Sequence, residues 1–167
     1  MSAQDEVDRI VAAWQRERGD LDLEPLTVFS RVGRLARHLD LARRGAFAAN
    51  QLEPWEFDVL AALRRAGEPY ALSPGVLITQ TLVTSGTMTN RIDRLELHGL
   101  VQRKPSPADR RGVIVHLTEE GLRRVDSAMS DLLQEEKHLL GSLPDADRRH
   151  LADLLRTLCL QFDSLDA

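Results

Sequence analysis

The chain has 167 residues, of which 43% are hydrophobic and 29% are charged, and its formal net charge is −4 at pH 7. This length suits one domain, and this composition excludes a mainly disordered chain. No apolar run approaches the roughly 20 residues of a membrane span, and the start MSAQDEVDRI is too polar for a signal peptide. Because the single cysteine, Cys159, excludes an internal disulfide framework, we expect a cytoplasmic protein.

The first half of the chain has the hydrophobic periodicity of helices separated by turn residues. The predicted helices cover residues 4–18, a stretch from Leu26 that frays near Gly45, Pro54 to Gly67, Ser73 to about Gln80, and Thr84 to Gly99. Ser73 is a favourable N-cap, and the proline after it fits the first turn of a helix.

After Gly99 the pattern changes to that of a β-hairpin. The segments LVQRKP and GVIVHLT are rich in β-branched or alternating apolar residues, and they flank the turn-prone PSPADRR. Thr118 then caps a long helix, and a last helix begins near Pro144. The apolar stripes expected to be buried on these two helices contain Leu122, Val125, Met129, Leu132, Leu133, Leu139 and Leu140, then Leu151, Leu154, Leu155, Leu158, Phe162 and Leu165.

A short helix, a second helix and a basic hairpin, in this order, form a winged helix-turn-helix. The predicted fold is therefore mainly α, with an α+β wing and long N- and C-terminal dimerisation helices. Within one structural unit we expect residues 51–117 to form the DNA-binding domain. Residues 1–50 would form dimerisation helices and a lid over a ligand site, and residues 118–167 would complete the dimer.

The stretch TSGTMTNRIDRLE, residues 84–96, is a poor helix former at its start, which suggests selection for contact with a nucleic acid. At 100° per residue, Met88, Ile92 and Leu95 share the core face, and small polar residues occupy the other half. Hydroxyl groups and a helix N-terminus bind phosphates, Asn pairs with adenine, and Arg pairs with guanine. With two arginines at the hairpin tip, the candidate DNA-binding residues are Thr84, Ser85, Thr87, Thr89, Asn90, Arg94, Arg110 and Arg111.

Positive charge is concentrated in the same segment. Residues 84–116 contain six basic and three acidic residues, whereas residues 118–167 contain six basic and eleven acidic residues. Taken alone, this cluster also fits a solvated charged face. Its position on a recognition-type helix and a hairpin favours DNA.

The apolar stripes of the first helix and of the last two exceed what a compact winged-helix core can cover. Soluble proteins avoid large exposed apolar patches, so we expect a homodimer with two recognition helices about one DNA turn apart. The alternative is that the terminal helices fold back on their own core.

The segment TSGTMTNRIDRLELHGLVQRKPSPADRRGVIVHLTEEG resembles the winged-helix core of the MarR family of bacterial transcription regulators, most strongly in DRRGVIVHLTEEG. The resemblance implies an obligate dimer that binds a pseudo-palindromic double-stranded DNA operator and represses transcription. It places Arg111 in the minor groove, with Asp109 orienting the neighbouring arginines.

The segments VDRIVAAWQRERGDLDLEP, EFDVL, TNRIDRLE and LVQRK are similar to the urate-responsive members of that family, which carry an extra N-terminal helix. This similarity implies ligand contacts from Trp14, Asp58, Arg91 and Arg103. We expect Asp58 to pair with Arg103 when no ligand is bound, and a planar anion such as urate to break that pair. The alternatives are a core tryptophan and an Asp–Arg pair that only fixes the wing.

Other kinds of site are weakly supported by the sequence. We predict no enzyme, no cofactor and no metal site, since His138 and His150 lack the spacing of a metal pair. Cys159 is expected to be a core thiol. Three alternatives stay open: another phenolic or aromatic effector, a response to Cys159 oxidation, and a winged-helix module that binds protein.

Overall fold

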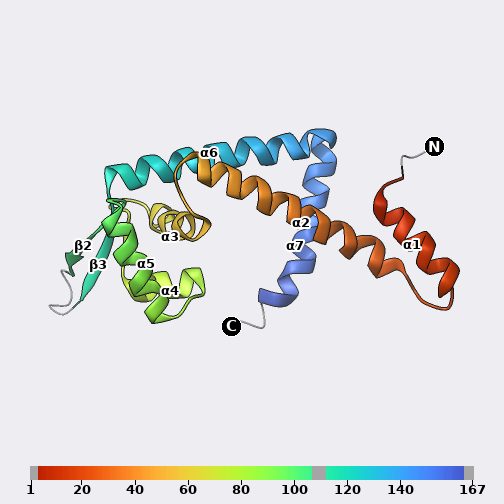
Figure 1. Ribbon diagram of the computed structural model, residues 1–167, viewed down its shortest axis with the longest axis horizontal. Helices are drawn as coiled ribbons and strands as arrows, with labels where there is room; N and C mark the ends of the chain where they lie inside the picture. Colours follow the sequence, from red (N-terminus) through yellow and green to blue (C-terminus); the bar gives the residue numbers. More distant parts are fainter. Residues whose placement is uncertain (1–3, 107–111, 164–167) are drawn as a thin grey trace.

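The computed structural model describes residues 4–106 and 112–163, and over these residues the protein is mainly helical with one small antiparallel sheet (Figure 1). The helices are α1 (Glu6–Glu17), α2 (Glu24–Ala49), α3 (Pro54–Arg65), α4 (Pro74–Thr81), α5 (Ser85–Leu97), α6 (Glu119–Leu139) and α7 (Asp145–Asp163), with a 3₁₀ turn at Leu140–Ser142. The strands are β1 (Ala71–Leu72), β2 (Val101–Pro105) and β3 (Val113–Leu117). This architecture confirms the predicted winged helix-turn-helix.

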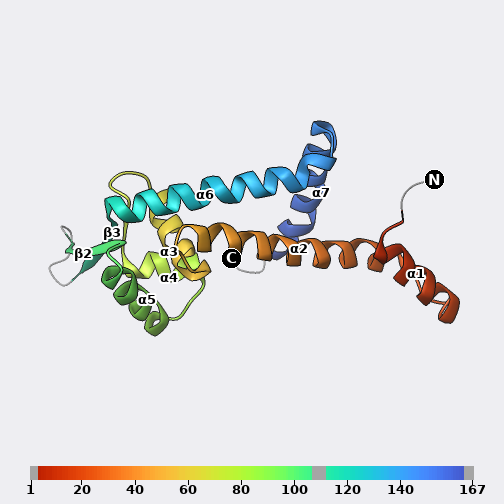
Figure 2. The same ribbon diagram turned by 45° about the horizontal axis from the view of Figure 1, so that its top comes forward.

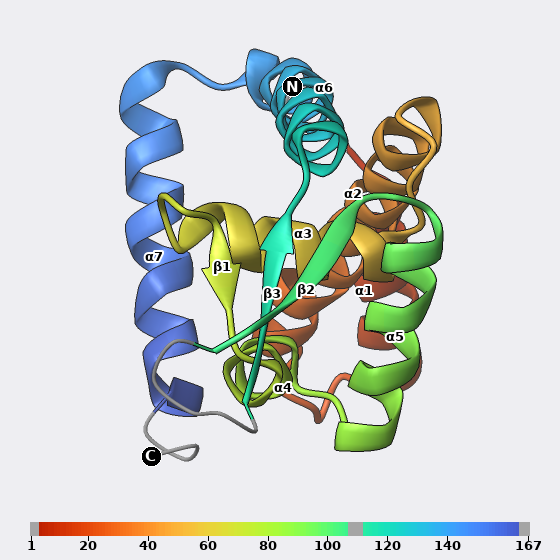
Figure 3. The ribbon, with the colours of Figure 1, turned by 90° about the vertical axis from the view of Figure 1, so that its left-hand side faces the viewer.

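The wing is the β2–β3 hairpin, extended by β1 into a sheet of order β1-β3-β2 (Figure 3). In the antiparallel register of the hairpin, Arg103 lies opposite Val115. The sequence did not predict β1, because two residues are too few to show an alternating pattern.

Helix α5 packs its apolar side against the domain core. Met88, Ile92 and Leu95 are buried, as their spacing predicts, and they join a cluster with Leu60 and Leu63 of α3. The opposite side of α5 is therefore turned to solvent.

Side-chain caps fix the starts of the helices that build the winged domain. The hydroxyl oxygen of Ser73 accepts a hydrogen bond from the Val76 amide, and that of Thr84 accepts one from the Thr87 amide. Thr118 does the same at α6 through the Gly121 amide, at 3.0 Å. Each cap satisfies a backbone donor that the first helical turn leaves free, which confirms Ser73 and Thr118 as helix starts.

The first turn of α6 lies directly against the junction of α5 and β2. The Thr118 amide donates to the Leu100 carbonyl at 3.1 Å, and the Thr118 hydroxyl donates to the Gly99 carbonyl at 2.7 Å. A Cβ atom on Gly121 would lie only 2.0 Å from the Leu100 carbonyl oxygen. Glycine is therefore required by this close approach.

Helix α2 is a continuous helix of 26 residues, and the predicted fraying near Gly45 is wrong. Ala46 and Phe47, just after this glycine, are buried against the core, and packing outweighs the low helix propensity of one glycine. At the end of α2 the Asn50 amide group donates to Asp131 of α6 at 2.7 Å, which ties the two long helices together.

Helix α1 lies at the far end of α2 from the winged domain (Figures 1 and 2). Val7 is buried against α2, and Arg31 of α2 pairs with Asp5 at 2.8 Å and with Asp8 at 2.7 Å. Hydrogen bonds from Arg31 and from the Asp8 amide lower the pKa of Asp5 to about 2. The N-terminal helix is thus held by ionic contacts as well as by apolar ones.

The apolar stripes of α6 and α7 are largely exposed in the single chain, which corrects the expectation that they are buried. Val125 and Leu132 are buried, but Met129 and Leu133 of α6 are exposed, and so are Leu154 and other apolar residues of α7. Leu165 lies outside the described residues. Cys159 is exposed as well, so its prediction as a core thiol is wrong for the isolated chain. None of the helices described is long and apolar enough to cross a membrane.

Candidate nucleic-acid interface and ligand pocket

The N-terminal half of α5 presents a row of small polar side chains to solvent. Ser85, Thr87, Thr89 and Asn90 are exposed, and Thr84 is the N-cap. The hydroxyls are held locally, since Thr84 and Thr87 share a 2.9 Å hydrogen bond and Thr89 donates to the Ser85 carbonyl at 3.0 Å. The Asn90 carboxamide has no hydrogen-bond partner among the residues described. This surface can therefore offer an amide, hydroxyls and helix-start N–H groups to DNA.

Arg94 lies against the start of α3. Its guanidinium is 4.7 Å from the Trp55 ring centroid and 3.5 Å from Glu53 Oε1, and Arg91 is 5.6 Å from the same ring. The Trp55 indole N–H donates to Glu53 Oε2 at 2.6 Å. Exposed pairs of this kind contribute little stability, so Arg94 can leave the tryptophan for a base or a phosphate.

A buried carboxylate, which the sequence reasoning missed, anchors the other end of α5. Glu56 is 3% exposed; one of its oxygens lies 2.9 Å from His98 Nδ1, and the other accepts a hydrogen bond from the Glu53 amide. Glu53 and Glu56 have the three-residue spacing of a capping box at the start of α3. This spacing is visible in the sequence and could have identified Glu56. Through this group the end of α5 is fixed to the start of α3.

The wing strand β2 is attached to α5 by Arg103. Its guanidinium donates to Glu96 Oε2 at 2.6 Å and also bonds Asp93, and its backbone N–H donates to Glu96 Oε1 at 2.9 Å. The hydrogen bonds from the Arg103 backbone N–H and from its guanidinium lower the pKa of Glu96 below its ordinary value. The predicted pair between Asp58 and Arg103 is therefore wrong: two carboxylates on the adjacent helix occupy the arginine.

The tip of the wing lies outside the described residues. Asp109, Arg110 and Arg111, the predicted wing contacts, fall in this gap. The described part of β2 starts beside the end of α5 and runs away from this helix toward the tip (Figure 3).

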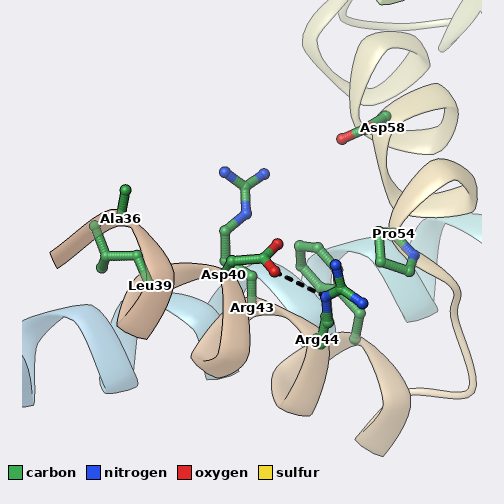
Figure 4. Close-up of a pocket in the computed structure, with 8 residues that line it drawn as sticks. Ala36, Leu39, Asp40, Arg43, Arg44, Pro54 and Asp58 are labelled. Atoms are coloured by element: carbon green, nitrogen blue, oxygen red, sulfur yellow. Dashed lines mark hydrogen bonds and ion pairs between the residues drawn. The ribbon is translucent and has the colours of Figure 1, made fainter. Parts of the chain in front are cut away.

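Asp58 faces a pocket of about 370 Å³ between α2 and α3 (Figure 4). Asp40 and Arg44 of α2 form a 2.9 Å ion pair at its edge, and the Arg43 guanidinium lies 5.8 Å from the Phe47 ring centroid. Asp58 itself forms no ion pair with any residue described. The pocket thus brings together the Asp58 carboxylate, which has no ion-pair partner among the described residues, and the Arg43 guanidinium, which covers the buried Phe47 ring.

The four predicted ligand residues lie in separate surroundings in the single chain. Trp14 is half exposed on α1, at the far end of α2 from the pocket of Asp58. The Arg91 guanidinium lies over the Trp55 ring, and Arg103 forms ion pairs with Asp93 and Glu96. Among the residues described, no cluster of three or more histidine, cysteine or acidic side chains could hold a metal.

Comparisons with known proteins agree with this geometry. The model of the MarR family matches residues 50–112. The chain is 37% identical over 150 residues, 90% of each chain, to the HTH-type transcriptional regulator PecS of Dickeya dadantii. It is 34% identical to the HTH-type transcriptional repressor NicR of Pseudomonas putida, over 83% of this chain and 88% of that one. Among solved structures, BpsR of Bordetella bronchiseptica, described as regulated in its DNA binding by 6-hydroxynicotinic acid, matches with a TM-score of 0.57 and 30% identity over 77% of this chain and 98% of that one.

Proposed function

The chain belongs to the MarR family of transcriptional regulators, and we propose that it is a repressor that binds duplex DNA as a homodimer and is released by a small planar anion. The observation that carries the DNA-binding part is the exposed polar half of α5 beside the β2–β3 hairpin. In this proposal residues 51–117 bind DNA, and residues 1–50 and 118–167 form the dimer. Thr84, Ser85, Thr87, Thr89, Asn90 and Arg94 enter the major groove, and Arg110 and Arg111 follow the phosphates or the minor groove.

Binding to DNA is tested by selecting duplexes from a random-sequence pool with the parent protein and measuring Kd on the selected and a scrambled duplex. Asn90→Ala should lose about 1–3 kcal/mol of discrimination between the two, because its amide has no hydrogen-bond partner among the described residues and can pair with adenine. Arg111→Ala should weaken binding to both duplexes alike, because a phosphate contact carries no sequence information. Selection of no duplex, or an Asn90→Ala protein that discriminates like the parent, contradicts the assignment of α5.

The exposed apolar residues of α6 and α7 support the homodimer. A single chain leaves Met129, Leu133, Leu154 and Phe162 in water, and isolated soluble proteins rarely expose a contiguous apolar face. A second copy, brought by a two-fold axis, would cover these side chains and set the distance between the two α5 helices.

For the effector we propose a planar aromatic anion such as urate, bound in the pocket of Asp58. Arg43 would attract the anion, and Asp58 would accept hydrogen bonds from its ring N–H groups. BpsR, a relative described as regulated by a planar aromatic acid, supports this chemical class. Trp14, Arg91 and Arg103 remain proposed contacts, which Trp14 can make only after a rearrangement or from the second copy.

The effector is tested by titrating urate and, separately, 6-hydroxynicotinate into the complex with the selected duplex. A hundredfold loss of DNA affinity would correspond to about 2.7 kcal/mol of coupling, within the usual range for allostery. Arg43→Gln should remove the response without changing DNA affinity, whereas Arg37→Gln, on the same helix but outside the pocket, should keep it. A Cys159→Ser protein should respond like the parent. If neither compound binds or releases DNA at millimolar concentration, the effector class is wrong and the repressor proposal stands on the DNA result alone.

A further inference from the structure

Arg103 joins the two elements that the proposed function places on DNA. Its backbone belongs to β2, the first strand of the wing, whereas its three hydrogen bonds end on the carboxylates of Asp93 and Glu96 in α5. Between the strand and the helix the chain reverses direction at Gly99, whose φ of +70° suits glycine. We name these three residues, Arg103 with Asp93 and Glu96, the wing clasp.

One carboxylate of the wing clasp lies close to the surface proposed to enter the groove. Asp93 follows Asn90 by three residues, which places the two about 60° apart around the helix. A carboxylate at this position would be repelled by the phosphates on either side of a groove. The Arg103 guanidinium offsets that charge and also donates to Glu96 Oε2, while the Arg103 backbone N–H donates to Glu96 Oε1.

The wing clasp has little to contribute to overall stability. The side chains of Asp93 and Glu96 are 58% and 40% exposed, and exposed ion pairs stabilise folded proteins weakly. The wing clasp is better suited to fixing the angle between strand β2 and helix α5. Two guanidinium bonds, one to each carboxylate, and one main-chain bond restrict the orientation of the wing strand relative to α5.

We propose that Arg103 is a positioning residue for DNA binding: it locks the wing to the recognition helix and screens Asp93 and Glu96 from the phosphates, without contacting DNA. This inference rests on the proposed function. It also defines what an anionic effector must do at this residue, since it must displace the carboxylates that hold Arg103.

The test is a double-mutant cycle on the selected duplex. Arg103→Gln should weaken binding about tenfold, because it frees the wing and uncovers two carboxylates. The same substitution in an Asp93→Asn, Glu96→Gln protein should weaken binding less than about threefold, because nothing remains there to be screened or held. Arg103→Lys, which keeps the charge but not the forked geometry, should fall between the parent and Arg103→Gln. The midpoint of thermal unfolding should change by less than about 3 °C in all these variants.

A direct DNA contact predicts a different pattern. Arg103→Gln would then cost the same affinity in both backgrounds, and the slope of log K against log salt would fall by about one. That result overturns the proposal, and so does an Arg103→Gln protein that binds like the parent.

Hydrogen exchange separates failure of this inference from failure of the proposed function. In the free protein, Arg103→Gln should speed amide exchange in peptides spanning residues 101–105 and 93–98, whether or not DNA is the partner. Unchanged exchange there excludes the wing clasp even if the parent binds DNA. If Arg103→Gln speeds exchange but the parent protein binds no duplex, the wing clasp does hold β2 to α5. It then has no role in DNA binding, and the proposal is rejected.

Discussion

Gly121→Ala is expected to destabilise the protein by about 3 kcal/mol, one of the largest effects of any single methyl group in this chain. The new Cβ would lie 2.0 Å from the Leu100 carbonyl oxygen and 3.1 Å from a Leu117 methyl group. Because that carbonyl also accepts the Thr118 amide, the methyl group cannot be accommodated by rotating a flexible side chain. The first turn of α6 must move away from the junction of α5 and β2.

The effect is measured by urea denaturation at one fixed protein concentration, since dimerisation makes apparent stability depend on concentration. Gly86→Ala is the matched control, because its Cβ meets nothing within 4 Å and alanine is the better helix former. We expect Gly86→Ala to be as stable as the parent or slightly more stable. Equal stability of the Gly121→Ala protein would show that the close approach described here is wrong.

Leu154→Glu is expected to convert the protein to a monomer and to lower its affinity for the selected duplex by about a hundredfold or more. In the single chain Leu154 is 52% exposed, so a charge there costs little. In the proposed dimer the same side chain is covered by the second copy, and an unpaired buried carboxylate is strongly unfavourable. Loss of the second recognition helix removes the avidity of paired half-sites.

Sedimentation equilibrium gives the oligomeric state directly. Leu97→Glu makes the same chemical change on α5, where the side chain is 83% exposed and far from α7, and should leave the oligomeric state unchanged. A parent protein that sediments as a monomer, or a Leu154→Glu protein that remains a dimer, contradicts the assignment of α7 to the interface.

The helices and the wing could be predicted because their signals are local. Ser73, Thr84 and Thr118 are capping residues at the positions where helices begin, and the period of Met88, Ile92 and Leu95 fixes the buried face of α5. Fraying at Gly45 was predicted wrongly because helix propensity was weighed without the packing of Phe47.

The candidate ligand site could be predicted only in part, because ion pairs depend on distances that the sequence does not contain. Asp58 and Arg103 have opposite charges, but the fold brings Asp93 and Glu96 closer to the arginine. The contact of Arg94 with Trp55 likewise depends on how α3 crosses α5, which the sequence does not contain. The prediction that the apolar stripes of α6 and α7 are buried is wrong for the single chain. Periodicity identifies an apolar face, but it does not say which molecule covers that face.

The length of helix α6 would set the distance between the two DNA half-sites that the proposed dimer binds. Its 21 residues make a rod of about 31 Å that starts at the root of the wing and ends at the turn into α7. The spacing of the two half-sites would then be set by the number of residues in this rod, whereas the bases read would be set by α5. Substitutions on α5 can change the operator sequence at constant spacing. A single residue inserted into α6 would turn one end against the other by about 100° and leave both recognition helices out of phase with the groove.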